Sequence, residues 1–145
     1  MMKILPATEQ DFDRLITLWE DSVRATHDFL SEAHIVTLRQ QIRDVYMPQL
    51  PLFLAADDEG SLLGFIGCHD KRIEMLFVSP QSRGSGVGKA LLSFAINELG
   101  CYLVDVNEQN PQARDFYLHM GFNQVGRSEY DGEGNPFPLL HLSLH

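Results

Sequence analysis

A glycine-rich turn between a strand and a helix is the feature that most constrains this chain. An apolar run ends at Val78, and the loop QSRGSGVGK at positions 81–89 leads directly into an amphipathic helix. Three glycines within five positions leave backbone N–H groups uncovered where the helix begins. These groups, together with the positive end of the helix, are suited to bind phosphate. The sequence therefore predicts a phosphate-containing ligand at this glycine loop.

Two common phosphate-binding motifs do not fit the glycine loop. A P-loop requires GxxxxGK followed by Ser or Thr, whereas Gly84 and Gly88 enclose three residues and Ala90 follows Lys89. A dinucleotide-binding turn requires GxGxxG, whereas this loop reads GxGxG. Chemistry on nucleoside triphosphates and dinucleotide binding are therefore disfavoured. Taken alone, the loop is equally consistent with a tight strand-to-helix connection.

Length and composition narrow the class of protein. The 145 residues suit one domain, residues 1–145, with a single core. The net charge of −9 disfavours a nucleic-acid partner, because such partners require a basic face. No run approaches the ~18 apolar residues of a membrane span, and no signal peptide precedes Glu9. Cys68 and Cys101 lack CxxC spacing, so we expect a cytoplasmic protein with two reduced, buried cysteines.

Hydrophobic periodicity and turn residues predict an ordered series of strands and helices. Strands are expected over residues 3–6, 52–56, 62–69, 72–78, 101–106, 122–130 and 137–144. Helices are expected over residues 8–23, 31–47, 87–99 and 110–120. The order mixes antiparallel hairpins with strands that are linked by helices. The predicted fold class is therefore α+β.

Two motifs resemble those of a known superfamily. The strand Leu76-Phe77-Val78 followed by Gln-x-x-Gly-x-Gly resembles motif A of the GNAT acyl-CoA-dependent N-acyltransferases. The segment Asn110-x-x-Ala113-x-x-Phe116-Tyr117-x-x-x-Gly121-Phe122 resembles motif B. Their order and separation also agree, and the resemblance covers the whole predicted layout, with a small bacterial subgroup the most similar. It implies a mixed, mostly antiparallel sheet of six to seven strands with helices on both faces.

The resemblance also implies acetyl-CoA as co-substrate. Backbone amides of the glycine loop would hold the pyrophosphate, and the edge of the preceding strand would pair with the pantetheine like an added strand. Asn110 would act both as a helix N-cap and as a cofactor contact. The implied cofactor-binding residues are Leu76, Phe77, Val78, Arg83, Gly84, Ser85, Gly86, Val87, Gly88, Lys89 and Asn110. No HxH or HxxxH spacing suggests a metal, and we expect none.

Transfer of an acetyl group to an amine requires a proton donor for the departing thiolate. Tyr117 matches the position of the superfamily's general acid, two helical turns after Asn110. An unperturbed tyrosine pKa of ~10 keeps the phenol protonated at neutral pH. The alternative role is a core aromatic, because Phe116 and Tyr117 lie on the apolar face of the predicted helix.

The group that removes the proton from the amine is not assigned by a motif. A lysine-like amine has a pKa near ~10.4, so its deprotonation at pH 7 costs about 4–5 kcal/mol. Glu74 is one candidate, and strand alternation predicts that it shares the face of Leu76. Asp105 is an equal candidate, because it precedes Asn110 by five residues, where the resemblance implies a catalytic carboxylate in other members. Each is otherwise a solvent-facing strand residue.

Histidines supply further candidates. His27, Asp28 and Phe29 lie between the first two predicted helices, a loop that the resemblance implies lines the acceptor site. His27 ranks after the two carboxylates as a base, and His69 is a further candidate. His141, in the last predicted strand, has two interpretations: a residue that faces the acceptor pocket or, more simply, a strand histidine with its hydrogen bonds satisfied.

The resulting prediction is an N-acetyltransferase in which a primary amine of a peptide, protein or small molecule attacks acetyl-CoA directly in a ternary complex. The acidic net charge mildly favours a cationic acceptor. A non-catalytic acyl-CoA-binding sensor of the same fold is the alternative. The acceptor, the acyl preference, the base, and the choice between monomer and homodimer all stay open at this point.

Overall fold

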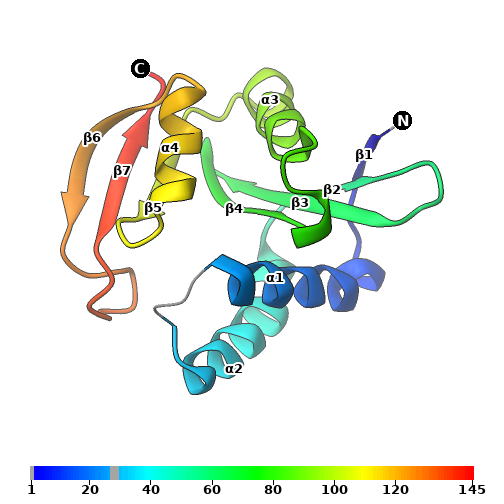
Figure 1. Ribbon diagram of the computed structural model, residues 1–145, viewed down its shortest axis with the longest axis horizontal. Coiled ribbons are helices and arrows are strands. Elements are labelled where there is room, and N and C mark those ends of the chain that lie inside the picture. Colours follow the sequence, from blue (N-terminus) through cyan, green and yellow to red (C-terminus); the bar gives the residue numbers. More distant parts are fainter. Residues whose placement is uncertain (1, 27–29) are drawn as a thin grey trace.

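A seven-stranded sheet organises the computed structural model, which describes residues 2–26 and 30–145 (Figure 1). Its strands follow the order β1-β2-β3-β4-β5-β7-β6. Their bounds are β1 (Lys3–Pro6), β2 (Leu52–Ala56), β3 (Leu62–His69), β4 (Arg72–Val78), β5 (Leu103–Asn107), β6 (Asn123–Ser128) and β7 (Leu139–Ser143). All neighbours are antiparallel except β4 and β5, which are parallel. The predicted α+β class and mixed sheet are confirmed.

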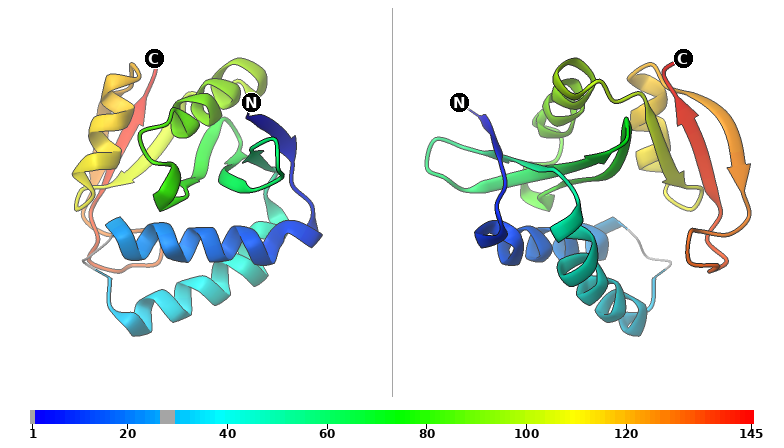
Figure 2. Two further views of the ribbon diagram at one scale, coloured as in Figure 1. Left: turned by 45° about the vertical axis from the view of Figure 1, so that its right-hand side comes forward. Right: turned by 180° about the vertical axis from the view of Figure 1, so that it is seen from behind.

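Helices cover both faces of the sheet, as predicted (Figure 2). The helices are α1 (Phe12–Thr26), α2 (Glu32–Gln41), α3 (Val87–Leu99) and α4 (Pro111–His119). One apolar cluster joins α3 and α4 to the sheet, and it includes Leu91, Val104 and Tyr117. A second cluster joins α1 and α2 to the opposite face, and it includes Trp19 and Phe65. The sheet thus separates two cores, and the candidate site lies at its centre.

The predicted helix boundaries are confirmed where a capping residue defines them. The Ser31 hydroxyl accepts the backbone N–H of His34 at 3.1 Å, at the start of α2. The Asn110 side chain accepts the N–H of Ala113 at 3.2 Å, at the start of α4. Gly100 has a φ of 70° and ends α3, a conformation that favours glycine. These local contacts determine where α2 and α4 begin and where α3 ends.

Several boundaries differ from the prediction. The predicted second helix is divided, because α2 is followed by a π-helical turn (Ile42–Tyr46) and a 3-10 turn (Met47–Gln49). β5 begins two residues late, because the N–H of Cys101 bonds the carbonyl of Ala95 and so belongs to the end of α3. The hairpin strands β6 and β7 are also shorter than predicted, because the Asp131 carboxylate accepts backbone N–H groups within their connection.

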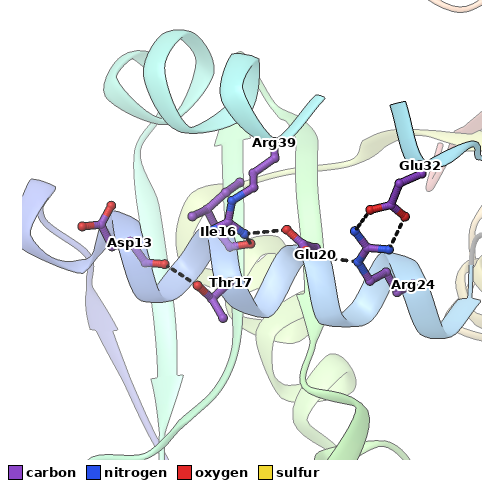
Figure 3. A network of polar contacts seen from close by, with 7 residues as sticks. All are labelled: Asp13, Ile16, Thr17, Glu20, Arg24, Glu32 and Arg39. Carbon is purple, nitrogen blue, oxygen red and sulfur yellow. Dashed lines mark hydrogen bonds and ion pairs between the residues drawn. The ribbon is translucent and has the colours of Figure 1, made fainter. Parts of the chain in front are cut away.

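An ion-pair network fastens α2 to α1 (Figure 3). The Glu20 carboxylate accepts hydrogen bonds from Arg24 at 2.9 Å and from Arg39 of α2 at 2.8 Å. Arg24 also binds both oxygens of Glu32 at 2.7 Å. The hydrogen bond from Arg24 is the main reason why the pKa of Glu20 lies below its ordinary value. Within the described residues, no helix is long and apolar enough to cross a membrane.

Candidate active site

The parallel strands β4 and β5 pair only where they begin. Arg72 lies opposite Leu103 and Ile73 opposite Val104, and the described pairing of these two strands ends there. β4 nevertheless remains paired with β3 as far as Val78. The two strands diverge beyond Ile73 (Figure 1), so the β4 edge that faces β5 is not used by the sheet. We call this divergence the β4–β5 fork.

A cavity of about 520 Å³ opens at the fork. This volume is in the usual range for small-molecule sites. Its lining includes Glu74, Leu76, Phe77, Val78, Arg83, Gly84, Gly86, Val87, Gly88, Lys89, Asp105, Asn110 and Tyr117. The structure therefore brings almost all of the predicted cofactor-binding and catalytic residues to one place. Lining residues that sequence reasoning missed include Ser22, Ser82, Asn107, Gln112 and Phe116.

The glycine loop adopts a conformation that ordinary residues avoid. Gly84 has a φ of 77° and Gly86 has a φ of 87°, and Gly86 forms the N-cap of α3. An added Cβ at either glycine would have no atom within 4 Å, so backbone conformation rather than crowding requires glycine. The first N–H groups of α3 have no carbonyl partners within the helix. The loop therefore fits an anionic group such as a phosphate.

Two polar side chains of the loop have partners in the protein. The Ser85 hydroxyl donates to the Ser82 carbonyl, and the Ser85 N–H bonds that same carbonyl at 3.3 Å. The structure accordingly does not bring Ser85 to the cavity lining, unlike its neighbours. Arg83 donates to the side chain of Gln112 at 3.3 Å. Because Gln112 lies on α4, this contact connects the glycine loop to the helix that carries Tyr117.

Tyr117 is both a core residue and a lining residue of the cavity. Its side chain is buried, with edge-on ring contacts to Phe116 at 5.1 Å and Phe122 at 5.5 Å between centroids. Burial is the main cause that raises the pKa of the Tyr117 phenol, and negative charge at Cys68 would raise it further. The phenol therefore stays protonated through the neutral range. It can donate a proton into the cavity.

Two carboxylates lie at the opening of the fork. Glu74 and Asp105 each directly follow the last paired residues of β4 and β5, and both line the cavity. Much of Glu74 is exposed to solvent. Its carboxyl group is nevertheless partly desolvated by the surrounding protein, and this desolvation is the main cause that raises its pKa. The negative charge of Asp105 raises that pKa further, whereas the positive charges of Arg72 and His69 lower it. Together the carboxylates form an acidic wall suited to a cationic amine.

Strand alternation, the basis for expecting Glu74 on the face of Leu76, does not hold in this part of β4. The β3–β4 register shifts between Gly67 and Cys68, so that Glu74 is an extra residue in a β-bulge. Ile73 and Met75, only two residues apart, consequently pack in the apolar clusters on opposite faces of the sheet. Strand alternation therefore fails at this position.

Asp105 is fixed by side chains from two neighbouring strands. Its Oδ1 atom accepts a hydrogen bond from Arg72 at 2.9 Å and lies 2.7 Å from Nδ1 of His141. His141 thus contacts the candidate base directly, a role that its sequence context did not indicate. The contact between His141 and Asp105 follows from the pairing of β5 with β7, and this pairing is known only from the folded structure.

The remaining candidates have two different outcomes. His27, Asp28 and Phe29 lie outside the described residues. His69 is exposed at the end of β3 and does not line the cavity. Over residues 2–26 and 30–145, no group of three or more His, Cys, Asp and Glu side chains could hold a metal ion. The expectation that no metal takes part stays a prediction.

Comparison with known proteins identifies the family of this chain. Residues 16–139 match the family model described as an acetyltransferase (GNAT) domain. The chain belongs to the GNAT acetyltransferase family. It is 40% identical to the peptidyl-lysine N-acetyltransferase YjaB of Salmonella typhimurium, over 98% of this chain and 97% of the relative. The Escherichia coli protein of the same name is 36% identical, over 99% of this chain and 97% of the relative.

Solved structures of GNAT proteins agree with this assignment. The solution structure of apo-form YjaB from Escherichia coli has a TM-score of 0.91 at 36% identity and covers 99% of this chain and 97% of its own. PaiA N-acetyltransferase from Thermoplasma acidophilum, solved in complex with coenzyme A, shares the fold, with a TM-score of 0.76 at 19% identity, and covers 100% of this chain and 99% of its own. This chain is therefore a GNAT enzyme that transfers an acetyl group to an amine. The family uses acetyl-CoA as the acetyl donor.

Proposed function

We propose that this enzyme acetylates the ε-amino group of lysine in peptides or proteins, by direct attack on acetyl-CoA in a ternary complex. The observation that carries the proposal is the β4–β5 fork, because it gathers the glycine loop, Tyr117 and two carboxylates around one cavity. The names of the two YjaB relatives support lysine as the acceptor. The two free, buried cysteines are consistent with a cytoplasmic location, and the continuous sheet supports a single domain over residues 1–145.

Backbone groups form most of the proposed acetyl-CoA site. The uncovered N–H groups at the start of α3 receive the phosphates, with Arg83 and Lys89 at the same cavity. The unused edge of β4 at Leu76–Val78 pairs with the pantetheine amides, as in strand addition. Asn110 borders the cavity and contacts the donor, while its side-chain oxygen also caps α4. Ser85 is left out of this assignment, because its polar groups bond Ser82.

The acceptor reaches the fork from its acidic wall. Glu74 and Asp105 attract the lysine ammonium, and Asp105 removes one proton, directly or through one water molecule. The neutral amine then attacks the thioester carbonyl, so that a C–N bond forms and the C–S bond breaks. Tyr117 gives its proton to the departing thiolate. The nitrogen releases a second proton as the amide forms, and this proton restores the phenol, while the first proton leaves Asp105 for solvent. The reaction needs no covalent enzyme intermediate. Neither cysteine is assigned a part in it, and both are buried.

A non-catalytic acyl-CoA sensor is less well supported. Such a module requires the glycine loop but has no use for a buried phenol and two carboxylates at the same cavity. The relatives at 36–40% identity are named as enzymes. We therefore favour catalysis as the role of this fork.

Turnover on peptides tests the proposal. Acetyl-CoA is mixed with a lysine peptide whose N-terminus is blocked, the same peptide with lysine replaced by norleucine, and a polyamine. A thiol-reactive dye follows release of coenzyme A, and mass spectrometry locates the added acetyl group. We expect acetylation of the lysine side chain only. Turnover confined to the polyamine would overturn the peptide assignment, and binding of acetyl-CoA without turnover on any amine would support the sensor.

A further inference from the structure

A continuous chain of polar side chains lies behind the acidic wall of the fork. His141 of β7 has Nδ1 at 2.7 Å from Oδ1 of Asp105 on β5, and Nε2 at 2.7 Å from the hydroxyl of Ser128 on β6. Strand register explains the proximity, because His141 lies opposite Asp105 on one side and opposite Gly126, two residues before Ser128, on the other. Side chains at these positions project from one face of the sheet.

The hydrogen-bonded series Asp105–His141–Ser128 uses only one of the two carboxylate oxygens of Asp105. Oδ1 interacts with both Arg72 and His141. No described residue donates a hydrogen bond to Oδ2. Asp105 lines the cavity. The carboxylate is thus anchored through one oxygen, while the other is left for a cationic acceptor or a bridging water.

The hydrogen-bonding capacity of each group determines which atoms donate and which accept along Ser128, His141 and Asp105. An ionised carboxylate only accepts, so the neutral His141 ring must carry its proton on Nδ1 and donate to Asp105. Nε2 is then an acceptor, so the Ser128 hydroxyl must donate to it. The Asp105 carboxylate therefore selects this tautomer of His141, and the Ser128 hydroxyl stabilises it by donating to Nε2.

We propose that His141 and Ser128 are positioning residues for acetyl transfer, which hold Asp105 so that Oδ2 receives the proton of the incoming ammonium. This inference rests on the proposed role of Asp105 as the base. The proton moves from the amine to Oδ2, the amine keeps the electron pair, and the Nδ1–H bond of His141 stays intact throughout. Neither positioning residue touches the reacting atoms.

A positioning role differs from a merely structural one in what it requires of residue 141. Arg72 already places one positive charge on Oδ1 of Asp105, so the contribution of His141 is a second, directional N–H donor to the same oxygen. A structural role would require only a side chain that fills the position. Rescue of kcat by another N–H donor therefore distinguishes the two roles.

Three variants test the inference. His141→Asn keeps an N–H donor for Asp105, His141→Leu removes the donor, and Ser128→Ala removes the partner of the other ring nitrogen. We expect His141→Leu to lower kcat about tenfold, less than the ~10²–10⁴-fold contribution of a whole general base, with KM for acetyl-CoA unchanged. His141→Asn should restore most of kcat. Ser128→Ala should lower kcat less than His141→Leu does.

A matched control and a separate variant keep the outcomes distinct. Arg127 neighbours Ser128 on β6 and pairs with Glu108 at 2.6 Å, so Arg127→Gln should leave kcat unchanged. Full activity of Asp105→Asn would overturn the proposed base itself. If Asp105→Asn is inactive while Ser128→Ala keeps the parent kcat, only the positioning role is overturned. Ser128→Ala decides this even if His141→Leu does not fold.

Discussion

The two arms of the β4–β5 fork are built in different ways. The arm that we propose for the cofactor consists of backbone groups of consecutive elements, namely the edge of β4, the glycine loop and the start of α3. The arm that we propose for the acceptor consists of side chains on separate strands, and Asp105 and His141 lie 36 residues apart in the sequence. A site made of consecutive backbone leaves a motif in the sequence. A site made of side chains across strands becomes visible only after the strands are paired.

The arms also differ in charge. Arg83 and Lys89 lie at the cofactor arm, where an anionic ligand is expected. Glu74 and Asp105 lie at the acceptor arm, where the lysine ammonium is expected. Opposite charges at the two arms attract each substrate to its own side and disfavour the reverse orientation. In the proposed mechanism, the catalytic centre lies between these two regions of opposite charge, next to Tyr117.

Tyr117, at the junction of the arms, should give the largest effect. Tyr117→Phe removes the proton donor and should lower kcat by about 10²–10³-fold, within the range for general acid catalysis. The Kd for acetyl-CoA should change little, because the ring remains packed in the core. Release of coenzyme A and a binding titration measure the two quantities. Tyr130→Phe, at an exposed tyrosine, is the control, and equal rates for both variants would remove Tyr117 from the mechanism.

The two carboxylates of the acceptor arm should affect different kinetic constants. Asp105→Asn should lower kcat by about 10²-fold, because it removes the proton acceptor. Glu74→Gln should mainly raise KM for the lysine peptide, because it removes one attracting charge. Steady-state kinetics with varied peptide separate these results. The reverse pattern, with kcat lost in Glu74→Gln alone, would assign the base to Glu74.

The cofactor arm should respond to backbone change rather than to charge. Gly86→Ala forces a non-glycine residue to a φ of 87° and should weaken acetyl-CoA binding about tenfold, while KM for the peptide stays constant. Gly60→Ala is a matched control, because Gly60 has a φ of 82° and is equally uncrowded, but lies in the β2–β3 turn. Both variants should lose similar stability. A similar loss of acetyl-CoA affinity in both would show that the glycine loop has no special part in binding.

Acid should weaken the acceptor arm before the cofactor arm. Because burial raises the pKa of Glu74, its carboxyl loses its charge at a higher pH than an ordinary glutamate does. KM for the peptide should therefore rise several-fold as the pH falls from about 7 to about 5, and this rise should be smaller in Glu74→Gln. The Kd for acetyl-CoA should be flat over the same range. An identical pH dependence of KM in parent and variant would contradict this account of Glu74.

The smallest effect concerns the ion pairs that hold α2 against α1. Glu20→Gln should lower the free energy of unfolding by about 0.5 kcal/mol, typical of a partly exposed pair. The pKa of Glu20 is lowered in the fold, chiefly by the hydrogen bond from Arg24. This stability is therefore present above the unfolded-state pKa and is lost as the pH falls through the lower folded pKa. Denaturant unfolding at neutral and acidic pH measures it, with Glu98→Gln, at an exposed residue of α3, as the control.

The same difference between the arms explains what sequence reasoning could predict. Capping residues such as Ser31 and Asn110 act within one turn of a helix, so the helix starts were predictable. The bulge at Glu74 was not, because it arises from register against β3 rather than from the residues of β4. His141 was treated as a strand histidine, since only the pairing of β5 with β7 brings it to Asp105. Local interactions could therefore be predicted from the sequence, whereas interactions between distant strands could be identified only in the folded structure.

The central claim is that acetyl-CoA and the lysine peptide meet at the β4–β5 fork from opposite arms. A nuclear magnetic resonance titration of the labelled protein tests it most directly, with coenzyme A added first and the N-blocked lysine peptide second. We predict that coenzyme A shifts the amide signals of residues 76–78 and 83–89, and that the peptide then shifts those of Glu74, Asp105 and His141. Shifts from coenzyme A that spare the glycine loop and the edge of β4 would contradict the account.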